Sequence, residues 1–227
     1  MRRRKSTIEL KAYLLQKAYY DLKGGVILIG IIDYGMGNLR SVEKAFQYLG
    51  CEAKIIDEVK MIRDADALVL PGVGAFPDAM ELLNKKGFSN AIKEEVKKGK
   101  LILGICLGMQ LLFDKSYEVK EVDGLHLLKG EIKEIKTNLK VPHIGWNSLI
   151  IRKNVPLLKK IKNGDNVYFV HSYYLTNGDE EDICAITEYG IEIPAVVCKD
   201  NIFSCQFHPE KSGDVGLQIL KNFAELI

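Results

Sequence analysis

The sequence predicts an α/β fold with a mostly parallel central sheet, flanking helices, antiparallel additions and a sharp turn from one strand end into a helix. Apolar runs of strand length alternate with helix-patterned segments between residues 26 and 113, which is typical of βαβ units. Residues 120–205 instead hold short strand-like stretches and few helices. Hydrophobic residues make up 47% of the 227 residues, which is enough to build a sizeable core.

The first half of the chain supplies the expected parallel strands. Residues 26–32 form a continuous apolar run, as in a central strand that is covered on both faces. Further apolar runs occupy residues 55–56, 67–70 and 101–105. Helical patterns lie between them at 38–49, 75–83 and 90–98, with Asn38 as the expected N-cap of the first. Strands joined by right-handed helical crossovers predict a flavodoxin-like sheet.

The second half is expected to extend this sheet. Four stretches are predicted as antiparallel additions: 166–170, 183–187, 193–198 and 202–205. A last helix is predicted over residues 213–226, and no linker divides residues 26–227, so these form one expected domain. Residues 6–23 could form a separate short helix, which Gly24 and Gly25 would end.

Composition and charge exclude several classes of protein. The longest candidate apolar run has seven residues, too few to cross a bilayer. Residues 1–25 carry a net charge of +5, whereas the rest of the chain carries −3, so a basic surface for nucleic acid is not indicated. The basic cluster at residues 2–5 resembles the start of a signal peptide, but no apolar core segment follows it, and we expect no secretion.

The cysteines indicate a reducing compartment, and we expect the cytoplasm. They are odd in number and widely spaced, without a CxxC or a His/Cys cluster, which argues against a disulfide framework and against a zinc site. For four of the five the simplest interpretation is a small buried hydrophobic residue. The five positions are Cys51, Cys106, Cys184, Cys198 and Cys205.

Cys106 stands in the pattern of a nucleophile elbow. Residues 104–108 read Gly-Ile-Cys-Leu-Gly, directly after an apolar strand and before a helix start. Such a turn is so tight that a Cβ on the flanking residues would collide with neighbouring backbone. A cysteine at a helix N-terminus is favoured as the thiolate. A buried cysteine without chemistry remains the alternative for this pattern alone.

His208 and Glu210 provide the expected partners of that thiol. They follow the strand-like residues 202–205, and Pro209 between them restricts the backbone. A histidine at a strand end can act as general base toward Cys106 and then return the proton to a leaving amine. Glu210 can hold the ring in one orientation, which predicts a Cys–His–Glu triad.

A tetrahedral intermediate also needs donors for its oxyanion. The N–H of Leu107, immediately after the cysteine, is one candidate. The loop at residues 71–74, Pro-Gly-Val-Gly, follows a strand at the same expected edge of the sheet. Its residues Gly72 and Gly74 would let backbone N–H groups, including that of Val73, approach a substrate. An ordinary strand-to-helix turn is the other interpretation of this loop.

These motifs resemble those of the triad-type glutamine amidotransferases, which carry GxCxGxQ and HPE. More narrowly, the chain is similar to the glutaminase subunits of imidazole glycerol phosphate synthases. Six blocks occur in the family order and span about residues 27–227: DYGMGN (33–38), PGVG (71–74), GICLGMQ (104–110), PHIGWN (142–147), HSY (171–173) and QFHPEKS (206–212).

The resemblance implies that glutamine is hydrolysed through a γ-glutamyl thioester on Cys106. The ammonia would pass to a cyclase subunit, a (β/α)8 barrel in a heterodimer, which makes imidazole glycerol phosphate and an aminoimidazole carboxamide ribotide for histidine biosynthesis. No metal or organic cofactor is expected. The implied glutamine-holding residues are Gly72, Gly74, Gln110, His171, Ser172 and Tyr173. The implied interface residues are Asn38, Trp146, Tyr168 and Lys211.

The resemblance also implies that the N–H of Val73 is misaligned until the cyclase binds. Trp146, the single tryptophan, could instead be a core residue. Family members usually begin near Val26, so residues 1–25 are interpreted as an upstream start or an added leader, with an ordered helix or a targeting arm as alternatives.

Two other classes of protein compete with this interpretation. A stand-alone cysteine hydrolase would suit the elbow, but it would leave the HPE block and the glutamine-holding blocks unexplained. A non-catalytic descendant would normally have lost Cys106 or His208, and both are present.

Overall fold

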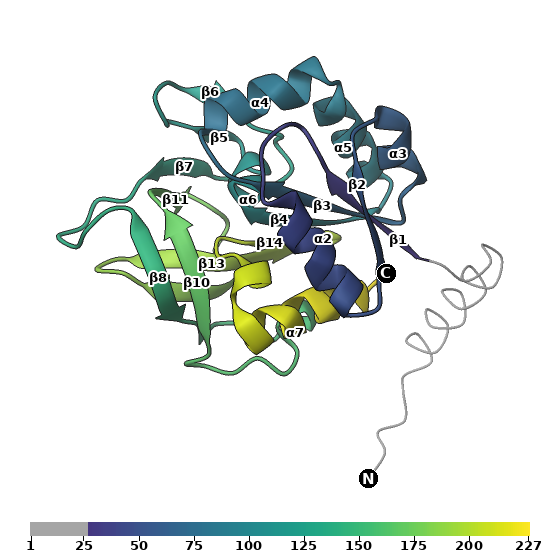
Figure 1. The fold of residues 1–227 in the computed structure, drawn as a ribbon. Coiled ribbons are helices and arrows are strands. Elements are labelled where there is room, and N and C mark those ends of the chain that lie inside the picture. The colour runs from purple at the N-terminus through teal and green to yellow at the C-terminus, as the bar shows by residue number, and fades with distance from the viewer. Residues whose placement is uncertain (1–26) are drawn as a thin grey trace, which may run out of the picture.

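An eight-stranded sheet lies at the centre of the structure, a computed structural model that describes residues 27–227 (Figure 1). The strand order is β2-β1-β3-β4-β14-β13-β12-β9. The strands from β2 to β14 run parallel, and β13, β12 and β9 join antiparallel. Their bounds are β1 Leu28–Ile32, β2 Glu52–Ile56, β3 Ala67–Gly72, β4 Leu101–Cys106, β9 Ile150–Ile151, β12 Ile183–Glu188, β13 Glu192–Lys199 and β14 Ile202–Cys205.

Helices cover both faces of the parallel part, as Figure 1 shows for α3, α4 and α5 on one side and α2 and α7 on the other. Successive side chains of a strand point to opposite faces. In β3, Leu68 therefore packs with the first group of helices and Val69 with the second. The helices are α2 Leu39–Tyr48, α3 Val59–Asp64, α4 Phe76–Lys85, α5 Phe88–Lys97, α6 Leu107–Leu111 and α7 Gly213–Ala224, with 3-10 turns η1 Pro156–Leu158 and η2 Pro209–Lys211.

Two smaller sheets stand beside the central one. The first has the order β11-β7-β5-β6, and the second pairs β10 with β8. In the second, Tyr168 lies opposite Trp146 and His171 opposite His143. The strands are β5 Lys115–Ser116, β6 Val122–Asp123, β7 Glu131–Glu134, β8 His143–Ser148, β10 Asn166–His171 and β11 Tyr173–Thr176.

The predicted parallel strands and the helices α2, α4, α5 and α7 are confirmed, but three local expectations are wrong. Strand β14 pairs antiparallel with β13 but parallel with β4, so it belongs to the parallel core. Residues 166–170 form β10 in the separate two-stranded sheet. Asn38 makes no side-chain cap on α2, and its Nδ2 instead donates to a Glu210 oxygen at 3.5 Å. The helix predicted over residues 6–23 lies outside the described residues.

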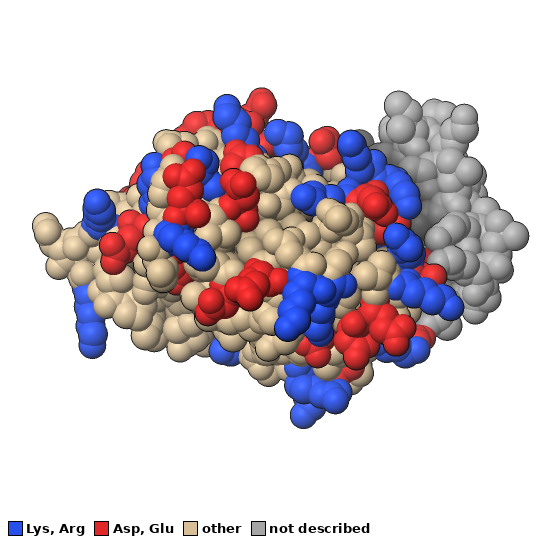
Figure 2. All heavy atoms as spheres, turned by 90° about the horizontal axis from the view of Figure 1, so that it is seen from above, with Lys and Arg blue, Asp and Glu red and all other residues tan. Residues whose placement is uncertain are grey.

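None of the helices in residues 27–227 has both the length and the apolar composition of a membrane span. In the same range, His, Cys, Asp and Glu side chains form no group of three that could hold a metal ion. All five cysteines have free thiols. Figure 2 shows acidic and basic side chains interspersed on the face seen from above in Figure 1, in keeping with the small net charge of the chain.

The sheet topology brings three segments to one edge. Strands β3 and β4 end side by side, with Gly72 opposite Cys106. On the other side of β4, Cys205 of β14 lies opposite Ile105. The 72–74 loop, the elbow and residues 206–210 therefore leave the carboxyl ends of three adjacent parallel strands, where open α/β sheets bind their ligands.

Candidate active site

Cys106 lies at a strained turn between β4 and α6. Its backbone has φ 55° and ψ −111°, a conformation that residues other than glycine rarely adopt. A Cβ on Gly108 would overlap the carbonyl oxygen of Leu70 in β3, and a Cβ on Gly104 would lie 2.8 Å from the Cα of Met109. Small residues are therefore needed on both sides of the cysteine, and the elbow expected from the sequence is confirmed.

His208 and Glu210 form a buried pair beside this elbow. His208 Nδ1 lies 2.9 Å from Glu210 Oε1, and the two side chains are only 2% and 1% exposed. Two further hydrogen bonds fix the turn that carries them. The His208 N–H donates to the Tyr168 carbonyl (2.9 Å), and the Ser212 hydroxyl donates to the His208 carbonyl (2.6 Å). The carboxylate therefore holds the ring in one orientation.

The charge state of His208 reflects opposing effects. Burial lowers its pKa, but the neighbouring Cys106 thiol and Glu210 carboxylate together raise it more, and the pKa reaches about 9. The thiol is close enough for this effect, although Nε2 has no partner aligned for a hydrogen bond among the described residues. The imidazole can thus hold a proton between a sulfur and a carboxylate, as an acid–base partner of the thiol must.

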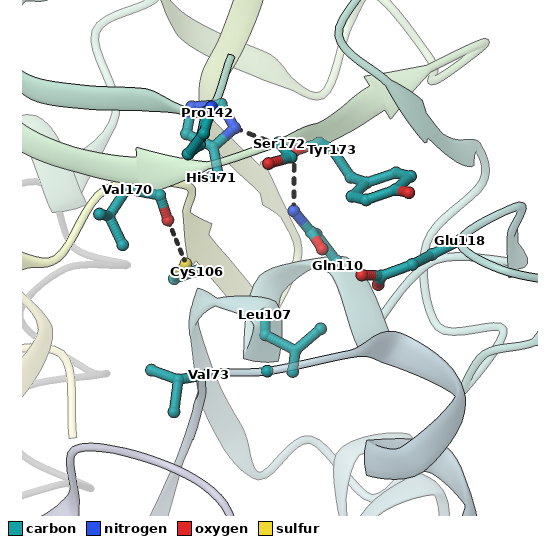
Figure 3. Close-up of a pocket in the computed structure, with 11 residues that line it drawn as sticks. Val73, Cys106, Leu107, Gln110, Glu118, Pro142, Val170, His171, Ser172 and Tyr173 are labelled. Atoms are coloured by element: carbon teal, nitrogen blue, oxygen red, sulfur yellow. Dashed lines mark hydrogen bonds between the residues drawn. The ribbon is translucent and has the colours of Figure 1, made fainter.

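A cavity of about 250 Å³ opens beside the Cys106 sulfur (Figure 3). Val170, on β10, accepts a hydrogen bond from the thiol through its carbonyl oxygen (3.7 Å). Eight residues predicted from the sequence line the cavity: Val73, Gly74, Cys106, Leu107, Gln110, His171, Ser172 and Tyr173. Gly72 does not line it. The space where its Cβ would stand is occupied by the Tyr34 hydroxyl, 2.5 Å away.

The far wall of the cavity is a connected set of hydrogen bonds. The Tyr173 carbonyl accepts from Gln110 Nε2 and from His171 Nδ1, both at 2.9 Å. Because a carbonyl only accepts, the His171 proton is on Nδ1, and Nε2 accepts from His143 Nδ1 at 3.1 Å. His143 Nε2 in turn accepts from Asn147 Nδ2 at 3.3 Å. Burial lowers the pKa of both histidines to about 4, so both rings are neutral at pH 7.

Glu118, which is not among the residues predicted from the sequence, also lines the cavity. Its Oε2 accepts a hydrogen bond from the Phe76 N–H (2.8 Å) at the start of α4, and burial raises the pKa of its carboxyl group. In the view of Figure 3, Gln110 stands between this carboxylate and the Cys106 sulfur. No sequence signal pointed to Glu118, because it lies in a short polar stretch without a motif.

The four predicted interface residues gather around the turn that carries His208. Asn38 Nδ2 lies 3.5 Å from Glu210 Oε1, and Lys211 is the exposed residue that follows Glu210. Tyr168 packs edge-on against Trp146, with ring centroids 6.0 Å apart. Trp146 is 57% exposed, so the alternative that the single tryptophan belongs to the core is wrong. Whether these residues contact a partner stays a prediction.

Comparison with known proteins identifies the class. Residues 30–226 match the family Glutamine amidotransferase class-I. A crystal structure described as that of a glutamine amidotransferase superposes with a TM-score of 0.69, covers 86% of this chain and 98% of that chain, and is 20% identical, which shows a shared fold. The chain belongs to the class-I glutamine amidotransferases.

Two relatives narrow the assignment. The protein named imidazole glycerol phosphate synthase subunit HisH from Caldanaerobacter subterraneus subsp. tengcongensis is 63% identical over 201 residues, which are 88% of this chain and 98% of that protein. The protein of the same name from Bacillus cereus is 50% identical over 200 residues, or 88% of this chain and 95% of that protein. Within its class, the chain therefore belongs to the HisH subunits of imidazole glycerol phosphate synthase.

Proposed function

We propose that this glutamine amidotransferase subunit hydrolyses L-glutamine through a thioester on Cys106 and passes the ammonia to a cyclase subunit. Its class rests on the family match and the relatives, and the proposal adds the chemistry and the residues. One observation carries the proposal: a cysteine on a strained turn faces a cavity and has the buried His208–Glu210 pair beside it.

In the first half of the reaction, the Cys106 thiol gives its proton to His208 Nε2, and the resulting thiolate attacks the amide carbon of glutamine. His208 then gives that proton to the leaving nitrogen, so ammonia departs and the γ-glutamyl thioester remains. Glu210 stays ionised at Nδ1 and stabilises the imidazolium. The N–H groups of Leu107 and Val73 are the proposed donors to the oxyanion.

In the second half, water attacks the thioester. His208 takes a proton from this water and gives it to the sulfur as the C–S bond breaks, so glutamate leaves and the Cys106 thiol is restored. The same two side chains, Cys106 and His208, therefore serve both halves, and His208 carries out every proton transfer. Because the His208–Glu210 pair is almost completely buried, its electrostatic effect on the thiol is little screened by solvent.

The far wall of the cavity would hold the amino-acid end of glutamine. We assign Gly74, Gln110, His171, Ser172 and Tyr173 to this role, as the family resemblance implies. Glu118 joins them on structural grounds. It is the carboxylate that lines the cavity, and an ionised carboxylate is the natural partner of the substrate's α-ammonium group.

The proposed partner is a (β/α)8-barrel cyclase, which would use the ammonia to make imidazole glycerol phosphate and an aminoimidazole carboxamide ribotide. Trp146 and Tyr168 present an exposed aromatic pair, a kind of side chain that often anchors an interface. Asn38 and Lys211 adjoin Glu210. A cyclase bound at this surface would therefore touch Asn38, which is itself hydrogen-bonded to Glu210 of the acid–base pair.

Replacing Cys106 by Ser tests the proposal in the complex with the cyclase. We expect glutamine-dependent synthesis to fall by ~10³-fold or more, while synthesis from added ammonium at high pH persists. Cys51→Ser, at a half-buried cysteine that does not line the cavity, is the matched control and should keep both activities. Loss of both activities in Cys106→Ser would mean that Cys106 is structural. Retained glutamine-dependent synthesis would mean that another group is the nucleophile.

A further inference from the structure

Gln206 is a fully buried side chain to which the chemistry above gives no role. It directly follows β14, two residues before His208, and is 0% exposed. Its Nε2 lies 3.8 Å from the Cys106 sulfur, and its Oε1 lies 3.0 Å from Gln110 Nε2. One side chain thus joins the candidate nucleophile to the wall of the cavity.

The orientation of the Gln206 amide is determined by its neighbours. The Tyr173 carbonyl is an acceptor only, so the group that Gln110 turns toward it must be the NH2. The second hydrogen of that NH2 points at Gln206, which must therefore offer its oxygen. It follows that Gln206 presents its own NH2 to the Cys106 sulfur, as a donor with a fixed direction.

Two groups in contact with the Cys106 sulfur favour different protonation states of the thiol. The Val170 carbonyl, at 3.7 Å, accepts a hydrogen bond from the S–H group and therefore favours the neutral thiol. The Gln206 N–H donates to sulfur in either state, and a hydrogen bond becomes stronger when its acceptor is charged. Ionisation of the thiol thus weakens the contact with Val170 and strengthens the contact with Gln206.

Three titratable groups interact electrostatically with Cys106: His208, Tyr34 and Cys205. Burial raises the pKa of the Tyr34 hydroxyl and of the Cys205 thiol, so both are neutral near pH 7. His208 is the one that can become a cation, but its Nε2 is not aligned for a hydrogen bond with the sulfur. The Gln206 amide is therefore the aligned donor to sulfur among the described residues.

We propose that the Gln206 amide holds the Cys106 sulfur in place and favours its thiolate over its thiol. Gln206 gains and loses no proton, since the thiol proton goes to His208. The proposal rests on the proposed function, in which this thiolate attacks glutamine. It also gives Gln110 a second task, because the contact between Gln110 and Gln206 fixes which way the donor points.

The test measures the reactivity of Cys106 in the full chain, with iodoacetamide as the probe and mass spectrometry of the peptide that holds Cys106. In Gln206→Met we expect alkylation at pH 7 to slow by about tenfold and the pH midpoint of the reaction to rise by about one unit. The plateau rate at high pH should stay the same or rise slightly, because a more basic thiolate is a better nucleophile.

Ser204→Ala is the matched control. Ser204 lies two residues earlier, is equally buried, and donates a hydrogen bond to the Val197 carbonyl (3.1 Å) without touching the sulfur. We expect it to keep the wild-type midpoint. An unchanged midpoint in Gln206→Met would overturn the proposal. So would a faster reaction at every pH, because that result means only that the sulfur has become more accessible.

If Gln206→Met does not fold, the proposal can still be tested by NMR spectroscopy of the unsubstituted chain. The side-chain NH2 resonances of Gln206 should shift with the same pH midpoint as the alkylation of Cys106. Resonances that stay constant through that midpoint would overturn the proposal. Neither experiment measures glutamine hydrolysis. A negative result would therefore overturn only the role of Gln206, and the proposed function would still be tested by the Cys106→Ser substitution.

Discussion

Acidification from pH 7 to pH 5 should destabilise the fold through His171. This ring is 6% exposed, and burial lowers its pKa to about 4, from 6.5 in an exposed histidine. Between these two values the unfolded chain binds a proton at this ring, whereas the folded chain does not. The free energy of unfolding therefore falls as the pH drops below 6.5.

The size of the effect follows from the two pKa values. At pH 5 the ring lowers the free energy of unfolding by about 2 kcal/mol, against less than about 0.2 kcal/mol at pH 7. His143, with a pKa also lowered to about 4 by burial, acts in the same direction. His208 acts in the opposite one. Its raised pKa of about 9 gives a stabilisation that is complete below pH 6.5 and is lost as the pH rises through 9.

Three histidines contribute to the pH dependence of the free energy of unfolding. The contribution of His171 is therefore measured by comparing variants. Urea unfolding at pH 7 and pH 5 would be compared for the natural chain, His171→Gln and His126→Gln. The glutamine carbonyl at 171 can still accept from His143, and His126, a half-exposed ring, controls for the loss of one imidazole. We expect the loss between the two pH values to be about 2 kcal/mol smaller in His171→Gln alone. Equal losses in all three chains would refute a neutral, buried His171.

Four substitutions, the first two compared with each other, test the triad, the elbow and the substrate site. Glu210→Gln should reduce the glutamine-dependent rate less than His208→Gln does, because an orienting residue is often the more dispensable; equal losses would mean that Glu210 does more than orient. Gly108→Ala should give no soluble folded protein, since its Cβ would overlap the Leu70 carbonyl, and a normally folded variant would contradict the elbow geometry. Glu118→Gln should raise KM for glutamine by about tenfold and spare ammonium-dependent synthesis; an unchanged KM would remove Glu118 from the substrate site.

The fold could be predicted where hydrophobic pattern decides it. The run at 67–70 and the run at 101–105 became β3 and β4, because strands covered on both faces need apolar side chains on both. Strand direction has no such signature. Residues 202–205 have the pattern of a short buried strand whichever way the strand runs, and only their pairing with β4 makes them parallel. Asn38 is a reasonable N-cap by residue type, but its side-chain NH2 donates to the Glu210 carboxylate and its oxygen makes no cap.

The site could be predicted where a motif constrains the backbone. Few other structures need the glycines around Cys106 or the HPE turn. These motifs therefore indicated that Cys106 and His208, 102 positions apart, come together at one edge of the sheet. Glu118 could not be found this way, because a carboxylate on a short polar stretch looks like any surface residue. Gln206 lay inside a motif, but its contact with the sulfur depends on the amide orientation that Gln110 imposes.

The most direct test is glutamate release from glutamine by the purified chain, alone and with a ligand-loaded cyclase subunit. We expect little release by the chain alone and a rise by orders of magnitude in the complex, because the Val73 N–H is expected to align only there. High release by the chain alone, unaffected by the cyclase, would contradict a coupled subunit and would indicate an independent hydrolase.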